Sequence, residues 1–192
     1  MAIDDLQTDY FETRLQQLLP VHDDHYISVY ESLLNISSTL KDQKSFDGLV
    51  SVAHMAYGWM PTVLHFNMTE KDTSEFFEKG EQGCLDQDFL ASCKLWINHS
   101  IIGASKVLHF FYPNKYPIWD SKVYETIFGL KPHHYQVNST AKYIQYTKKL
   151  RDLSQNSSSL AVLKEGLMAK GYCQTQASNL GVLELILFYS VR

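Results

Sequence analysis

Cysteine is scarce in this chain of 192 residues, and its spacing argues against the common metal centres. The three cysteines are Cys84, Cys93 and Cys173. An odd number of widely separated thiols has neither the paired spacing of a zinc site nor the clustered spacing of an iron–sulfur site. We therefore expect reduced thiols, no catalytic metal and no cofactor.

Long apolar runs are also missing. The acidic N-terminus, MAIDDLQTDY, lacks the basic start and the apolar core of a signal peptide. The longest apolar stretch, residues 180–191, contains Glu184 and is shorter than the roughly 20 residues that a membrane-spanning helix needs. These absences predict a soluble, cytoplasmic protein that makes no membrane contact.

The sequence shows no run of period-two alternation with hairpin turns, so it predicts no sheet. Apolar residues instead recur at helical spacing almost throughout, without an internal repeat. The clearest helices are expected at residues 86–98, 104–112, 140–153 and 177–189, the last being apolar on nearly every side. The expected fold is all-α, with about eight or nine helices in a single domain over residues 1–192.

Acidic residues are rare in the central segment of the chain. Residues 94–151 carry nine Lys or Arg and two Asp or Glu, whereas residues 1–93 carry five and sixteen. A basic segment inside an acidic chain predicts a face that attracts the phosphate backbone of nucleic acid. Ordinary lysine on solvated helix surfaces is the alternative.

A glycine marks the junction of two expected helices in this basic segment. Gly103 lies between residues 86–98 and 104–112, where a tight turn needs a residue without a side chain. Backbone N–H groups at the start of the second helix would then face outward and hold a phosphate group. The pattern predicts a helical hairpin that contacts a nucleic-acid backbone.

An aspartate stands at the start of the next helix. Asp120 follows a connection stiffened by Pro117 and precedes an apolar-periodic segment that begins at Val123. Because Asp is a favoured N-cap residue, we expect its carboxylate to be held in place by the helix that it caps. A cap without any chemical role is the alternative.

This arrangement resembles the helix-hairpin-helix superfamily of DNA glycosylases and, more loosely, its 8-oxoguanine glycosylase branch. In that family, a helix, a glycine hairpin and a second helix with a lysine lead through a proline-containing loop to an aspartate of the form Asp-x-x-Val. The matching positions here are Gly103, Lys106, and Asp120 with Val123. The resemblance implies two helical lobes around a cleft, with the hairpin and the catalytic element within residues 86–129.

The resemblance also implies a chemistry. Asp120 would stabilise the positive charge that develops on the sugar when an N-glycosidic bond breaks. Lys106 matches the amine that attacks the sugar carbon in enzymes with added lyase activity, and a plain DNA contact is its alternative role. A flipped base needs a pocket of flat side chains, although core packing is the alternative for such residues. The candidates for the base pocket are Tyr57, Trp59 and Trp119, and those for DNA contacts are Gly103, Ala104, Ser105 and Lys122.

The sequence thus predicts a monomeric DNA glycosylase that excises a modified or damaged base from double-stranded DNA, in repair or in antiviral defence. The short chain suggests a base outside the common oxidised purines, such as a modified base of foreign (phage) DNA. Two other interpretations stay open. One is a non-catalytic DNA-binding module that keeps the hairpin, and the other is a helical interaction or regulatory protein whose acidic N-terminal half binds a partner.

Overall fold

The computed structural model describes residues 2–21, 24–59, 62–172 and 177–190. These residues form eleven α-helices and one short 3-10 helix, and their only strand-like pairing is an isolated bridge between Phe66 and Ile97, so the predicted all-α class is confirmed. The elements are η1 (Ile3–Asp5), α1 (Thr8–Gln17), α2 (His25–Gln43), α3 (Phe46–Trp59), α4 (Glu70–Gln82), α5 (Gln87–Trp96), α6 (Ile101–Phe111), α7 (Ser121–Phe128), α8 (His134–Val137), α9 (Thr140–Leu153), α10 (Ser157–Ala169) and α11 (Asn179–Tyr189).

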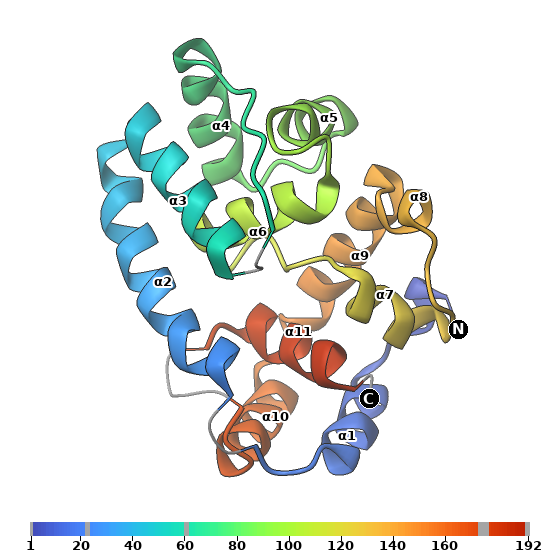
Figure 1. The fold of residues 1–192 in the computed structure, drawn as a ribbon. Helices are drawn as coiled ribbons and strands as arrows, with labels where there is room; N and C mark the ends of the chain where they lie inside the picture. Colours follow the sequence, from blue (N-terminus) through green and yellow to red (C-terminus); the bar gives the residue numbers. More distant parts are fainter. Residues whose placement is uncertain (1, 22–23, 60–61, 173–176, 191–192) are drawn as a thin grey trace.

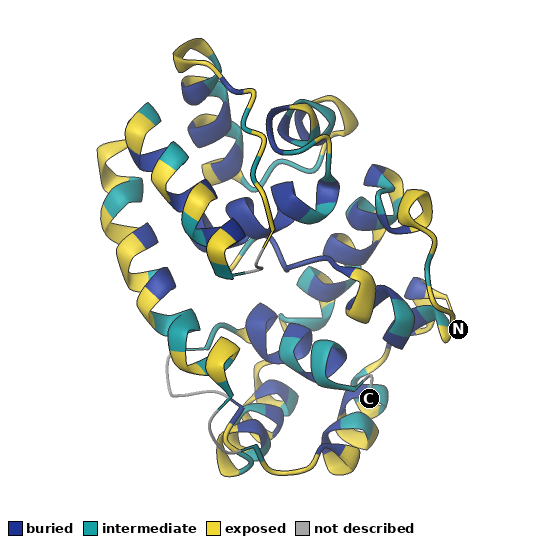
Figure 2. Ribbon diagram, in the orientation of Figure 1, coloured by how far each residue is buried: buried dark blue, intermediate teal, exposed yellow. Residues whose placement is uncertain are grey.

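Two helices organise the core (Figure 1). Helix α6 packs against α2, α3 and α5, whereas α11 packs against α1, α7, α9 and α10. In α6, all side chains except that of Ile102 are buried, including three polar ones. Figure 2 shows the buried residues gathered on these inner helices and the exposed residues along the outer faces of α2 and α4. Within the described residues, no helix has the length and apolar character needed to cross a bilayer.

Helix α4 has no counterpart among the helices expected from sequence. Its N-terminus is a capping box, in which the backbone N–H and the hydroxyl of Thr69 donate to the carboxylate of Asp72 at 2.8 and 2.7 Å. Gly83, at a φ of +72°, ends the helix. Such a Thr-x-x-Asp pattern is a signal of a helix start, and it was available in the sequence.

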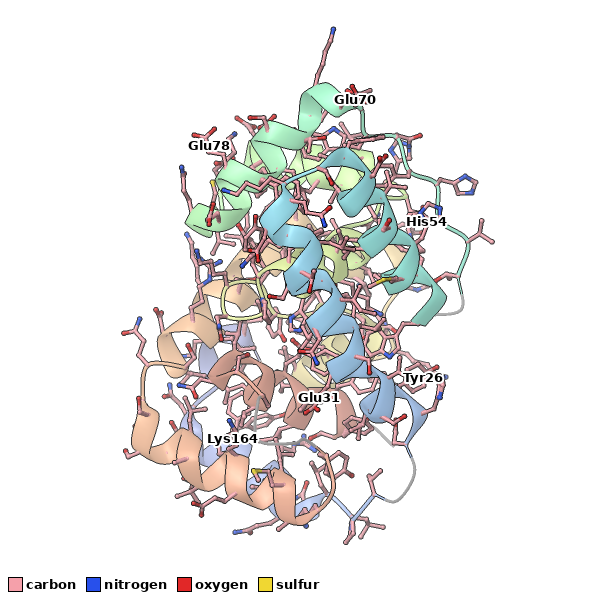
Figure 3. The ribbon with its side chains drawn as sticks, turned by 90° about the vertical axis from the view of Figure 1, so that its left-hand side faces the viewer. Tyr26, Glu31, His54, Glu70, Glu78 and Lys164 are labelled. Atoms are coloured by element: carbon pink, nitrogen blue, oxygen red, sulfur yellow. The ribbon has the colours of Figure 1, made fainter. Side chains whose placement is uncertain are left out.

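The acidic side chains of α4 lie away from the centre of the fold. Figure 3 shows Glu70 and Glu78 projecting at one end of the molecule, whereas Tyr26 and Glu31 lie further along, on α2, and Lys164 of α10 lies toward the other end. These two carboxylates of α4 are therefore remote from the N-terminal part of α2.

Candidate active site

A cavity of about 540 Å³ lies between α2, α3, α6, α11 and the segment that precedes α7. This volume is within the range of small-molecule sites. Seven tyrosine, tryptophan and phenylalanine side chains line it, together with a small set of charged groups that includes Lys106, Asp120 and Glu184. These seven residues are Tyr26, Tyr30, Tyr57, Trp59, Tyr172, Phe188 and Tyr189. The elements that enclose the cavity surround the centre of the view in Figure 1.

Asp120 is held at the edge of this cavity as the N-cap of α7, as the sequence predicts. Its Oδ1 atom accepts a hydrogen bond from the backbone N–H of Val123 at 2.9 Å, and the residue is 8% exposed. Its other oxygen, Oδ2, accepts no hydrogen bond from the part of the chain that the structure describes. One oxygen therefore fixes the carboxylate, and the second has no partner among the described residues and can accept a hydrogen bond from another group.

The segment before Asp120 is fixed by side chains of three helices. The hydroxyl of Ser105 lies 3.1 Å from Trp119 N, which donates to it, and the hydroxyl of Tyr146 donates to Ile118 O at 3.2 Å. The N–H of Ile118 donates to the carboxylate of Glu184 at 2.7 Å. A backbone held from α6, α9 and α11 keeps the Asp120 carboxylate in one position.

Lys106 lies in the same cavity, on α6. The residue is 8% exposed, and its Nζ atom lies 5.7 Å from the ring centroid of Trp59 without a hydrogen bond to any described residue. Burial lowers the pKa of the amine, an effect that the nearby carboxylates of Asp120 and Glu184 oppose. A lowered pKa enlarges the fraction of neutral amine, which is the nucleophilic form.

Two of the three aromatic residues expected at the base pocket do line the cavity. Tyr57 and Trp59 come from the end of α3, and the indole N–H of Trp59 donates to Tyr26 O at 3.3 Å. The Trp59 ring also makes edge contacts with Tyr26 and Phe110 at centroid distances of 5.8 and 5.6 Å. These contacts orient flat surfaces around the space that Lys106 borders.

The prediction for Trp119 is wrong. Its side chain is fully buried outside the cavity, where the indole N–H donates to Val137 O at 2.7 Å and the ring packs on Tyr146 at 4.9 Å. Its two neighbours in the chain, Ile118 and Asp120, line the cavity, whereas Trp119 between them faces the core. Such alternation is typical of extended backbone, in which successive side chains point to opposite sides.

The prediction that Gly103 makes the hairpin turn is also wrong. Helix α6 begins at Ile101, and the turn from α5 lies at residues 97–100, where Asn98 and His99 have φ values of +55° and +50°. Ser100 caps α6 through its hydroxyl, and a serine at this position is a sequence signal of a helix start. Gly103 lies within the first turn of the helix, where it allows Tyr57 to approach the backbone.

The expected phosphate-binding N–H groups at the start of α6 have partners inside the protein. Ser100 accepts hydrogen bonds from Gly103 N and Ala104 N at 3.3 and 2.9 Å, and Asn138 Oδ1 accepts one from Ile101 N at 2.9 Å. Ala104 and Ser105 are also fully buried. The bonded N–H groups of Gly103 and Ala104 and the burial of Ala104 and Ser105 therefore contradict the predicted DNA contacts through these residues.

Asn138 joins the α5–α6 turn to the end of α8. Besides accepting from Ile101, its side-chain amide donates to His99 O at 3.0 Å, and its backbone carbonyl accepts from Lys94 Nζ at 3.0 Å. The turn is thus tied to two other parts of the fold.

Four of the nine basic residues of segment 94–151 are hydrogen bonded to other groups of the protein. These four donors are Lys94, Lys115, Lys142 and Arg151. Lys122 is exposed at the cavity, with its Nζ atom 4.3 Å from the ring centroid of Phe188. Of the residues expected to contact DNA, Lys122 alone has an exposed side chain.

Three further groups, none of them among the predicted site residues, meet beside the cavity: Tyr30, which is half-buried, and His109 and Glu184, which are buried. The hydroxyl of Tyr30 is hydrogen bonded to His109 Nε2, and the opposite ring nitrogen, Nδ1, lies 2.8 Å from Tyr116 O and 3.4 Å from Glu184 Oε2. Burial lowers the pKa of His109 to about 4. Burial also raises the pKa of Glu184 to about 8, with Asp120 adding to the rise and Ile118 N–H and Lys106 opposing it. The position of a glutamate in the middle of an apolar helix was the available signal for Glu184.

In the described part of the chain, no three His, Cys, Asp or Glu side chains come together as ligands for a metal ion. Cys84 and Cys93 are free thiols, and Cys173 lies outside the described residues. Comparison with known protein families, characterised proteins and solved structures finds no match to this chain. A function must therefore be inferred from the residues that line the cavity.

Proposed function

We propose that this protein is a DNA glycosylase that receives a flipped base in the cavity and breaks its N-glycosidic bond with the help of Asp120. The observation that carries the proposal is the Asp120 carboxylate, which has one oxygen fixed by Val123 N–H and the other free beside an aromatic-lined cavity. In this proposal, the helices that pack around α6 and those that pack around α11 are the two lobes, with the cavity as the cleft between them.

Asp120 suits the charge that such a reaction creates. Departure of the base leaves positive charge on the sugar, and a carboxylate that is already in place stabilises it without moving. Because α7 fixes Oδ1, the free Oδ2 is the oxygen that faces the sugar or orients the attacking water.

The surrounding residues suit a nucleoside as the bound group. Tyr57, Trp59 and Tyr26 offer flat surfaces on which a nucleobase stacks once it leaves the duplex. Lys122, exposed at the cavity, suits a phosphate of the same strand. Lys106 is placed to attack the sugar carbon, which would add lyase activity.

The direct test is incubation with duplexes that each carry one modified base, followed by alkali to cut at abasic sites. The set includes oxidised, deaminated and alkylated bases and the modified bases of phage DNA. We expect strand cleavage at one or a few of these bases, dependent on the protein. Binding to every duplex without product would favour the non-catalytic DNA-binding module, and absence of both binding and product would favour the interaction protein.

A further inference from the structure

Glu184 is a buried acid with one oxygen bound and one oxygen free. It lies on α11, where its neighbours along the helix are apolar, and it is 7% exposed. Oε2 accepts a hydrogen bond from Ile118 N–H at 2.7 Å and lies 3.4 Å from His109 Nδ1. Oε1 forms no hydrogen bond with the described residues and is not fully enclosed, and Glu184 is one of the residues that line the cavity.

The hydrogen-bond pattern locates the proton of the neutral acid. Because Oε2 accepts an N–H from the backbone, a protonated Glu184 carries its proton on Oε1. His109 does not compete for this proton. Its Nδ1–H donates to Tyr116 O, so its Nε2 accepts from the hydroxyl of Tyr30, and both ring nitrogens have partners.

The charges around Glu184 favour the protonated state at neutral pH. Burial raises its pKa to about 8, and the negative charge of Asp120 acts in the same direction. The ionisable groups that face it are Lys106 and His109 from α6, Tyr30 from α2, Asp120 from the segment before α7, and Tyr143 and Tyr146 from α9. Of these, Lys106 is the group whose protonated form would stabilise the carboxylate left after proton release.

We propose that Glu184 is the acid that protonates the departing base, while Asp120 stabilises the sugar from which the base departs. This inference rests on the proposed glycosylase function. Asp120, at the start of α7, and Glu184, on α11, both line the cavity, so both carboxyl groups are within reach of a nucleoside bound there.

The atoms of this step balance. The C1′–N bond breaks, its electron pair goes to the base, and the proton of Glu184 Oε1 is transferred to the base. Water, or the amine of Lys106 where lyase activity is added, then forms a bond to C1′, and the proton that this nucleophile loses restores the acid through solvent. The two carboxyl groups thus have different roles: the charged one, Asp120, stabilises the sugar, and the neutral one, Glu184, donates the proton.

The test is Glu184→Gln in the full chain, assayed under single-turnover conditions on the duplex that the parent protein cleaves best. A glutamine keeps the hydrogen bond to Ile118 N–H through its carbonyl oxygen but has no acidic proton. We expect the rate near pH 7 to fall about 100-fold or more, the usual contribution of a general acid. Affinity for a duplex with a tetrahydrofuran abasic analogue should stay within about twofold, since a mere loss of structure would weaken both.

The pH profile provides a readout that a structural role would not move. In the parent, the excision rate should decline about tenfold per pH unit above the pKa of Glu184. This decline should be absent in Glu184→Gln, which has no acidic proton, and present in Glu184→Asp. Glu125→Gln on α7, outside the cavity lining, is the matched control and should behave as the parent does. A parent rate that does not change between about pH 6 and 9.5 overturns the proposal whatever the variants do.

Failure of the inference and failure of the proposed function give different results. If the parent excises a base and Glu184→Gln does so equally fast, Asp120 remains the candidate and Glu184 is not the donor. If the parent excises no base from any duplex, the glycosylase function itself is refuted, and the role of Glu184 with it.

Discussion

The hydroxyl of Tyr57 occupies the space next to Gly103 that a methyl group would fill. This contact brings α3 against α6 and places a tyrosine, whose pKa is raised to about 12 by burial, at the cavity. The glycine is therefore needed for the approach of two helices rather than for a turn.

Gly103→Ala should destabilise the fold by about 1–3 kcal/mol, because the new methyl group must displace Tyr57 or the helix backbone. Chemical denaturation measures the loss. Gly58→Ala is the matched control, since a methyl group at Gly58, also in a helix, meets no atom within 4 Å and should be neutral or stabilising by up to about 1 kcal/mol. Adding Tyr57→Phe to Gly103→Ala should recover part of the loss, and a double variant no more stable than the single one would contradict this account.

Asp120→Asn should abolish base excision and keep DNA binding, because asparagine also caps a helix but carries no charge. The measurements are single-turnover cleavage and binding to an abasic-analogue duplex. Asp86 caps α5 in the same way, with Oδ1 2.7 Å from Phe89 N, and it does not line the cavity. Asp86→Asn should therefore excise normally, whereas Ala at either position should cost about 1 kcal/mol of stability. Equal excision by Asp120→Asn and the parent would refute the role of Asp120.

Borohydride should trap a covalent protein–DNA adduct if the amine of Lys106 attacks the sugar, because reduction makes the Schiff base permanent. We expect the adduct with the parent protein, its loss in Lys106→Met, and its retention in Lys122→Met. Gel electrophoresis of the trapped species measures all three. An active parent that gives no adduct would leave a reaction with water and exclude Lys106 as a nucleophile.

The stability of the fold should depend on pH in opposite directions through two buried groups. Glu184, with its pKa raised to about 8, keeps its proton where the unfolded chain has lost it, so its contribution declines as pH rises from 4.5 to 8. His109, with its pKa lowered to about 4, stays neutral where the unfolded chain is protonated, so its contribution declines as pH falls from 6.5 to 4.

Between about pH 4.5 and 6.5, the effects of Glu184 and His109 on the stability of the fold have opposite signs. Above about pH 6.5, only the effect of Glu184 remains. Denaturation of the parent should therefore show a loss of about 1–2 kcal/mol between about pH 6.5 and 8, at about 1.4 kcal/mol per pKa unit. The loss should disappear in Glu184→Gln and persist in His109→Asn. An equal decline in Glu184→Gln would assign it to other groups.

The features that the sequence predicts correctly are those set by near neighbours in the chain. Helix α9 has the predicted bounds, and Asp120 caps α7 as its place before Val123 suggests. The turn at residues 97–100 differs from the prediction because two residues other than glycine, Asn98 and His99, take positive φ values there. The helix then begins after the cap at Ser100, before Gly103.

The features that sequence reasoning missed are assembled from distant segments. The contacts among Tyr30, His109 and Glu184 join α2, α6 and α11. Because these residues are far apart in the sequence, no pattern of neighbouring residues predicts that they meet. Trp119 was assigned to the cavity from its place beside Asp120, whereas its orientation depends on whether the backbone is extended there.

The attachment of Asn138 to the α5–α6 turn has a thermodynamic consequence. With Ile101 N–H, His99 O and Lys94 all bonded to one asparagine, the turn has lost its conformational freedom during folding. Because the turn is already ordered, binding of a ligand to it would cost little further conformational entropy. More of the free energy of the contacts would then contribute to affinity.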